Sequence, residues 1–149
     1  MRIPYKRKRE GKTNYPKRLQ MLVSRKHRLV IRKTLAGMIV QVVSYEPNGD
    51  KILVSAYARD LKKHGVPKIN SNITIAYLTG FLCGVRAKQN KITSGIVDLG
   101  LQKAHPKGKL FAAVRGLRDA GIDVAADEKM FPDDSRIGDV EPVKKSILQ

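Results

Sequence analysis

The sequence has one cysteine, no long hydrophobic run and few acidic residues, and each shortage excludes a class of protein. A single cysteine, Cys83, excludes an internal disulfide and a cysteine-rich zinc module. The most apolar helical stretch, Ile75 to Val85, has eleven residues, whereas a membrane span needs about twenty. No apolar run follows the basic N-terminus, so it is not a secretory signal, and residues 1–34 hold one serine, unlike a mitochondrial presequence. We therefore expect a soluble intracellular protein with no membrane partner.

Acidic residues are scarce: 13 Asp and Glu stand against 30 Lys and Arg in 149 residues, which gives a net charge of +17. Such an excess attracts a polyanion, and nucleic acid is the commonest one. The charge is +12 over residues 1–34, +9 over 35–118 and −4 over 119–149. The like charges in residues 2–18 predict an arm that is unfolded alone and becomes ordered on a phosphate-rich surface. The acidic C-terminal segment should avoid that surface and face solvent or a protein.

Apolar patterning predicts alternating strands and helices between the charged ends. Residues 47–50 read Pro-Asn-Gly-Asp, a strong hairpin turn signal. Three asparagine and serine residues at 70–72 offer N-cap side chains for a helix. The expected elements, in chain order, are a short helix near 17–23, strands over 28–34, 38–43 and 51–57, a helix from the capping residues to 89, a strand over 94–100 and a helix over 108–121.

This order, β-β-β-α-β-α, implies an α/β domain with a mixed sheet and a right-handed crossover between the third and fourth strands. We place this globular domain at residues 24–122, after a basic arm with a short helix at 1–23 and before an acidic extension at 123–149. In the long helix, a stripe of small residues is expected to bring the helix backbone close to the sheet. These residues are Ala76, Gly80, Cys83 and Ala87.

Signals for catalysis or metal binding are weak. The strand order is similar to a ribonuclease-H-like layout, so a two-metal nuclease is one alternative, but that chemistry needs several converging carboxylates. The predicted strands supply Asp98 and, at a turn, Asp50. Asp98 is interpreted as a strand-end or loop carboxylate, and Cys83 as a buried thiol. The three histidines share no ligand spacing. We predict no enzyme activity, no metal and no cofactor.

Three basic elements point to RNA instead. The arm carries eight Lys and Arg in residues 2–18, interleaved with two tyrosines that can stack on unpaired bases. A second group surrounds the first strand, at Arg25, Lys26, Arg28, Arg32 and Lys33. The third is the loop 103–109, which opens the last helix, where backbone N–H groups favour phosphate. No recognition helix is evident, so structured RNA is favoured over a short DNA site, and a general RNA chaperone remains an alternative.

Three blocks of sequence carry a family resemblance. They read RKREGKTNYPKRLQMLVSRKHRLVIRKT, INSNITIAYLTGFLCGVRA and GLQKAHPKGKLFAAVRGLRDAGI. Together they resemble the L-eighteen family of large-subunit ribosomal proteins, which binds 5S ribosomal RNA, over residues 5–132 and in the family's order. The FPDD-containing C-terminal segment is similar to that of archaeal members.

The resemblance implies a three-layer, ribonuclease-H-like domain without nuclease activity, in the cytoplasmic ribosome. Its implied partners are 5S rRNA, the large-subunit rRNA and neighbouring ribosomal proteins of the central protuberance. The segments implied to bind RNA coincide with the three basic elements. Their residues are Arg7, Lys8, Arg9, Lys12, Thr13, Asn14, Tyr15, Arg18, Ser24, Arg28, Arg32, Lys33, Lys107 and Lys109.

Overall fold

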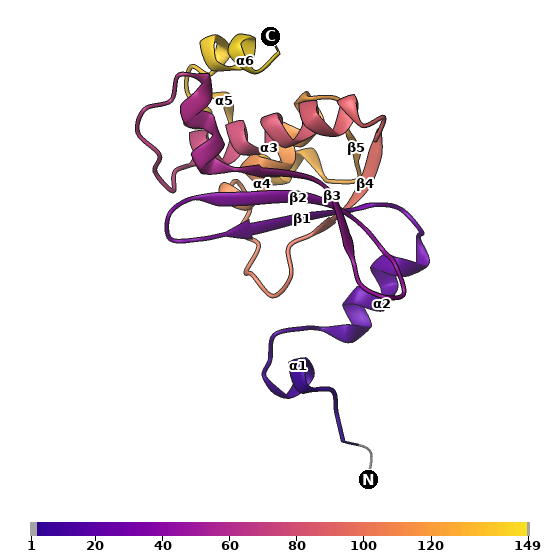
Figure 1. Cartoon of the computed structure of the whole chain (residues 1–149). Helices are drawn as coiled ribbons and strands as arrows, with labels where there is room; N and C mark the ends of the chain where they lie inside the picture. The colour runs from indigo at the N-terminus through magenta and orange to yellow at the C-terminus, as the bar shows by residue number, and fades with distance from the viewer. Residues whose placement is uncertain (1–2, 149) are drawn as a thin grey trace.

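The computed structural model describes residues 3–148 and contains a five-stranded mixed sheet (Figure 1). The strand order is β3-β2-β1-β4-β5; β1 pairs antiparallel with β2 and β2 with β3, whereas β4 is parallel to both β1 and β5. The predicted α/β class is therefore confirmed. The strands are β1 Arg28–Lys33, β2 Met38–Ser44, β3 Lys51–Tyr57, β4 Ser94–Asp98 and β5 Asp123–Val124.

The first four strands lie where the sequence predicts them, because their apolar residues alternate or run continuously. In β1, Leu29 and Ile31 are fully buried, while the intervening residues point to the other face. The turn between β2 and β3 contains Gly49 at φ +144°, a conformation that favours glycine. The fifth strand was not predicted, since two residues give no readable period.

Two long helices, α3 (Ile73–Gln89) and α4 (Lys109–Asp119), cover one face of the sheet (Figure 1). The Asn72 side chain caps α3 by accepting a hydrogen bond from the Ile75 N–H at 2.9 Å. The expectation that the small-residue stripe of α3 meets the sheet is wrong for Gly80. A Cβ placed on Gly80 would lie 2.1 Å from the backbone oxygen of Ala113 in α4. Gly80 therefore lets α3 come close to α4, the helix with which α3 makes its most extensive contacts.

The basic arm contains two short helices on the side of the sheet opposite α3 and α4 (Figure 1). These are α1 (Lys6–Arg9) and α2 (Tyr15–Val23), so the predicted helix exists and begins two residues earlier than expected. Neither α1 nor α2 contains a buried residue. A 3-10 helix, η1 (Ala58–His64), follows β3 and was not predicted. It ends at Gly65, whose φ is +85°.

The acidic C-terminal segment packs against the body. It forms η2 (Glu128–Met130), α5 (Asp134–Ile137) and α6 (Glu141–Leu148) after β5. α5 and α6 both contact α3, and Thr74 of α3 donates a hydrogen bond to the Ile137 carbonyl at 2.8 Å. Residues 123–148, which the sequence predicts to be part of an acidic extension, thus contact the body through α5 and α6. Five apolar residues of this segment enter the core: Val124, Phe131, Ile137, Val140 and Ile147.

No helix within residues 3–148 is both long and apolar enough to span a bilayer.

Candidate nucleic-acid interface

The arm and the face of the sheet away from α3 and α4 enclose a hollow of about 380 Å³. On β1, the period of two places Arg28, Val30 and Arg32 on this face. From the arm, the hollow is lined by residues of the segment 7–21. Residues predicted from separate segments to bind RNA thus come together here: Arg7, Lys12, Thr13, Asn14, Arg18, Arg28 and Arg32.

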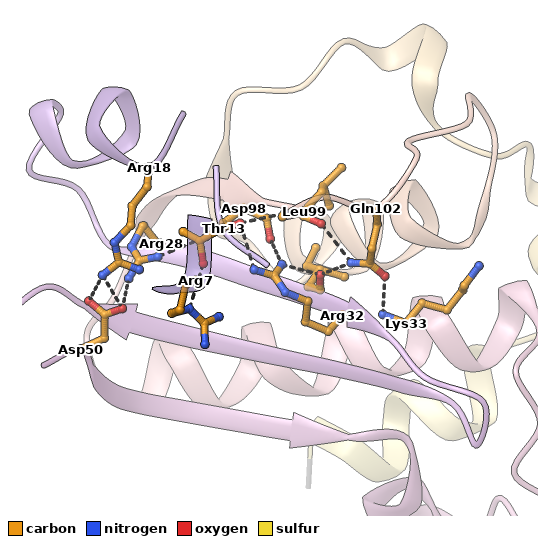
Figure 2. A network of polar contacts seen from close by, with 12 residues as sticks. Arg7, Thr13, Arg18, Arg28, Arg32, Lys33, Asp50, Asp98, Leu99 and Gln102 are labelled. Atoms are coloured by element: carbon orange, nitrogen blue, oxygen red, sulfur yellow. Dashed lines mark hydrogen bonds and ion pairs between the residues drawn. The ribbon is translucent and has the colours of Figure 1, made fainter. Parts of the chain in front are cut away.

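Arg28 lies at the floor of this hollow and is almost fully buried (Figure 2). Its guanidinium donates hydrogen bonds to Asp98 Oδ2 at 3.1 Å and to Asp50 Oδ2 at 2.5 Å. Its Nε has no acceptor among the described residues. The geometry gives Arg28 the role of an internal ion-pair partner rather than that of a group free to contact phosphate.

Asp50 connects the buried Arg28 to the arm. It lies in the turn between β2 and β3, and Arg18 of α2 donates from Nη2 to its two carboxylate oxygens at 2.9 and 2.8 Å (Figure 2). Burial raises the pKa of Asp50, but the hydrogen bonds and positive charges of Arg28 and Arg18 outweigh it and hold the pKa below its ordinary 3.8. The carboxylate is therefore ionised at neutral pH and binds two arginines.

Asp98, at the end of β4, orients a further arginine of the hollow. Arg32 Nη2 donates to Asp98 Oδ1 at 3.1 Å, and Arg32 Nη1 donates to the Asp98 carbonyl at 2.6 Å. The Gly100 N–H also donates to Asp98 Oδ1, at 2.8 Å. Arg32 remains 39% exposed, so its guanidinium is held in a defined position and still reaches solvent. Asp98 is a strand-end carboxylate, as predicted, but its burial was not foreseen.

Gln102 fixes the loop after β4 against β1. Its side-chain amide donates to the carbonyls of Ile31 and Leu99, and its oxygen accepts from the Lys33 N–H at 2.8 Å (Figure 2). The Lys33 side chain itself is exposed. The loop after β4 thus begins beside the face of the sheet that lines the hollow.

Local hydrogen bonds shape the arm. Asn14 caps α2 by accepting from the Lys17 N–H at 3.1 Å, and Arg7 Nε donates to Thr13 Oγ1 at 2.9 Å. The rings of Tyr5 and Tyr15 lie 5.2 Å apart between centroids. Three of the arm residues predicted to bind RNA are exposed cations: Lys8, Arg9 and Lys12. Lys12 forms a 3.0 Å ion pair with Glu10.

Ser24 ends α2, where its hydroxyl donates to the Met21 carbonyl at 2.7 Å. The residue is exposed and does not line the hollow. The same hydroxyl accepts from the Lys26 N–H at 3.3 Å, so both contacts of the side chain shape the end of α2.

The two predicted lysines of the loop before α4 do not line the hollow. Lys107 has a φ of +55°, and its N–H donates to the Met130 carbonyl at 2.9 Å. Its Nζ lies 3.0 Å from Asp133 in the acidic segment. Lys109 is the first residue of α4. Lys107 is therefore joined to the C-terminal segment, a contact that local sequence does not reveal.

Comparison with known proteins gives the family. The family model described as ribosomal large subunit proteins 60S L5 and 50S L18 matches residues 1–95. The chain is 41% identical over 136 residues to large ribosomal subunit protein uL18 of Korarchaeum cryptofilum, covering 91% of this chain and 70% of that protein. It is 43% identical to the proteins of the same name from Methanothermobacter thermautotrophicus and Methanobrevibacter smithii, over 91% of this chain. The chain belongs to this family.

As a family member, the protein is an RNA-binding constituent of the large ribosomal subunit in the cytoplasm, and it is not an enzyme. The two carboxylates of the hollow, Asp50 and Asp98, each form ion pairs with two arginines. Within residues 3–148, no group of three or more His, Cys, Asp or Glu side chains could hold a metal ion.

The sequence did not reveal which side chains pair with the arginines of the hollow in this family member. Asp50 was interpreted as part of a turn, and Gln102 was not singled out. The available signal was the period of two in β1, which puts Arg28 and Arg32 on one face of a sheet. Arginines on a partly buried face of a sheet require anionic partners, because a buried charge without a partner is strongly destabilising.

Proposed function

We propose that the protein binds 5S rRNA through the cationic face formed by the arm and by the side of the sheet opposite α3 and α4. It would thereby help to attach 5S rRNA to the large-subunit rRNA in the central protuberance, beside neighbouring ribosomal proteins. The observation that carries this proposal is the convergence of the arm with β1 around one hollow.

The chemistry of this face suits folded RNA. Exposed lysines and arginines neutralise phosphates and release counterions. The paired Tyr5 and Tyr15 provide rings that can stack on unpaired bases, which structured RNA offers and duplex DNA does not. Arg32 adds a guanidinium whose direction is set by Asp98, and a fixed fork suits bidentate contact with a phosphate.

Lys107 and Lys109 belong to the proposal with one condition. For Lys107 to bind phosphate, its ammonium has to exchange the carboxylate of Asp133 for an RNA oxygen. That ion pair is exposed, so little free energy opposes the exchange. Lys109 has no such partner among the described residues, and it stands where the backbone N–H groups of α4 begin.

We also propose that the domain has the ribonuclease-H-like layering that the family resemblance implies. In that arrangement the sheet is the central layer, α3 and α4 form one outer layer, and the arm covers part of the other face.

Competition binding tests the ligand. Labelled 5S rRNA is bound to the full chain and displaced with unlabelled 5S rRNA or with transfer RNA, across a salt series. If six to ten phosphates are neutralised, affinity should fall by about 10³–10⁵ between about 50 and 200 mM salt. We expect 5S rRNA to remain the better competitor at every salt concentration.

Equal competition by transfer RNA throughout the series would contradict the proposal. The arm would then be a generic polycation, as in a general RNA chaperone, which binds unrelated RNAs of equal length about equally well.

A further inference from the structure

The arm has one ion pair with the body among the described residues, between Arg18 and Asp50. No residue of α1 or α2 is fully buried, although Met21 and Leu22 of α2 are partly buried. Hydrophobic packing therefore holds these helices less firmly than a buried apolar face would. A nine-residue helix such as α2 is also marginal by itself in water. The place of the arm over the sheet therefore depends strongly on this contact.

Asp50 is a rigid anchor because its other partner is buried. Arg28 binds Asp50 with one nitrogen and Asp98 with another, and its side chain is only 4% exposed. Asp98 is in turn held at the end of β4. The chain of contacts runs from α2 through Arg18, Asp50 and Arg28 into the sheet (Figure 2).

We propose that Asp50 is a positioning residue for RNA binding, which holds the cationic arm over the sheet by accepting both hydrogen bonds from Arg18. This inference rests on the proposed function for its ligand, but the arm contact itself does not. On this proposal the Asp50 carboxylate favours RNA binding, although it carries the same sign of charge as the phosphates.

The sign of the effect separates this role from simple charge. A carboxylate near phosphates repels them, so exchanging it for an amide should by charge alone tighten binding. If Asp50 positions the arm, Asp50→Asn should instead weaken binding. Glu46 lies in the same connection between β2 and β3, is exposed and forms no ion pair among the described residues. Glu46→Gln therefore makes the same change of charge without touching the arm.

The experiment measures 5S rRNA affinity for the full chain and for Asp50→Asn, Glu46→Gln, Arg18→Gln and the double variant of Arg18 and Asp50. We expect Asp50→Asn to weaken binding about tenfold, because the amide keeps one oxygen that can accept from Arg18 but loses the negative charge that makes this hydrogen bond strong. Glu46→Gln should bind as tightly as the wild type or slightly more tightly. With Arg18→Gln already present, Asp50→Asn should cause no further loss, because the contact through which it acts is gone.

Hydrogen exchange of the α2 amides, measured without RNA, gives a readout independent of the ligand. Asp50→Asn and Arg18→Gln should both speed this exchange, and Glu46→Gln should not. Arg18→Gln leaves the Arg28 ion pairs untouched, so it tests the arm contact even if Asp50→Asn perturbs the sheet.

Three results would overturn the inference. One is binding by Asp50→Asn that is as tight as that of Glu46→Gln. Another is an equal loss from Asp50→Asn in the presence and absence of Arg18. The third is unchanged exchange of α2 in Arg18→Gln. If the wild type binds transfer RNA as well as 5S rRNA, the ligand proposal fails, but the exchange data still decide the role of Asp50.

Discussion

Arg28, Arg32 and Arg18 are alike in sequence and differ in what they can do. Arg28 is buried between two carboxylates, Arg32 is held but reaches solvent, and Arg18 joins the arm to the body. Charge patterning located the surface on which all three lie. It could not tell which arginine is free, because the Asp98 that binds Arg28 is 70 positions away in the chain. Pairing over that distance depends on the sheet order, which places β4 beside β1.

Cys83 was predicted to be a buried thiol, and the structure confirms that it is free and fully buried. Burial raises the pKa of its thiol to about 12, against a smaller lowering by the charge of Arg86. The thiolate is the reactive form, so we expect almost no alkylation of the native protein near neutral pH. Mass spectrometry after iodoacetamide treatment across a urea series measures this.

Labelling of Cys83 should rise together with the loss of helical circular dichroism. Fast labelling in the absence of urea, at a rate close to that of the denatured chain, would show that α3 opens locally or that its inner face is exposed.

Glycine decides how the two long helices approach. Gly80 of α3 faces the backbone of Ala113 in α4. A Cβ on Gly116 of α4 would lie 2.2 Å from the backbone oxygen of Tyr77 in α3. In an exposed helix, exchanging glycine for alanine stabilises by about 1 kcal/mol. At Gly80 we expect the opposite sign, a loss of about 2 kcal/mol or more, since the helices must move apart. Urea unfolding followed by circular dichroism measures the change.

Stability of Gly80→Ala equal to or above that of the wild type would mean that α3 and α4 are not in close backbone contact. Lys88→Ala gives a matched control near the end of the same helix, because Lys88 is exposed and its exchange should change stability little.

Elements with a strong local signal were predictable, and elements that depend on their surroundings were not. The β2–β3 hairpin and α3 carry a turn signal and an N-cap, so their positions follow from sequence. The stripe of small residues in α3 was also recognised, but the element that packs against it was not. Small residues indicate that another backbone comes close, and they do not indicate which element it belongs to. β5 and η1 escaped because their conformation is set by packing against β4 and α3.

The basic N-terminal arm and the acidic C-terminal segment pack against the body in different ways. The acidic C-terminal segment lies against α4 and the loop before it, where Asp133 pairs with Lys107, Glu128 with Arg118 and Asp134 with Arg115. Composition predicted that this segment avoids phosphate. It did not reveal that the acids meet cations of the same chain while the apolar residues between them enter the core.

The basic arm is the opposite case, since it carries charge and no buried residue. Deleting residues 1–15 should therefore leave the thermal unfolding midpoint almost unchanged and weaken binding of 5S rRNA. The deletion removes six Lys and Arg, and each lost phosphate contact should reduce the slope of log affinity against log salt by about 0.7–0.9. A large drop in the unfolding midpoint would show instead that the arm is part of the core.

A control with less charge but an intact arm makes the deletion informative. Four exposed cations in and just after η1, none of which lines the hollow, can be exchanged together for glutamine: Arg59, Lys62, Lys63 and Lys68. Long-range attraction would fall in this variant too, so a small loss of affinity is expected from net charge alone. The arm deletion should cost clearly more per charge removed, because its cations lie on the face proposed to touch RNA. Equal losses per charge would mean that the protein attracts RNA through its overall charge, with no preferred face.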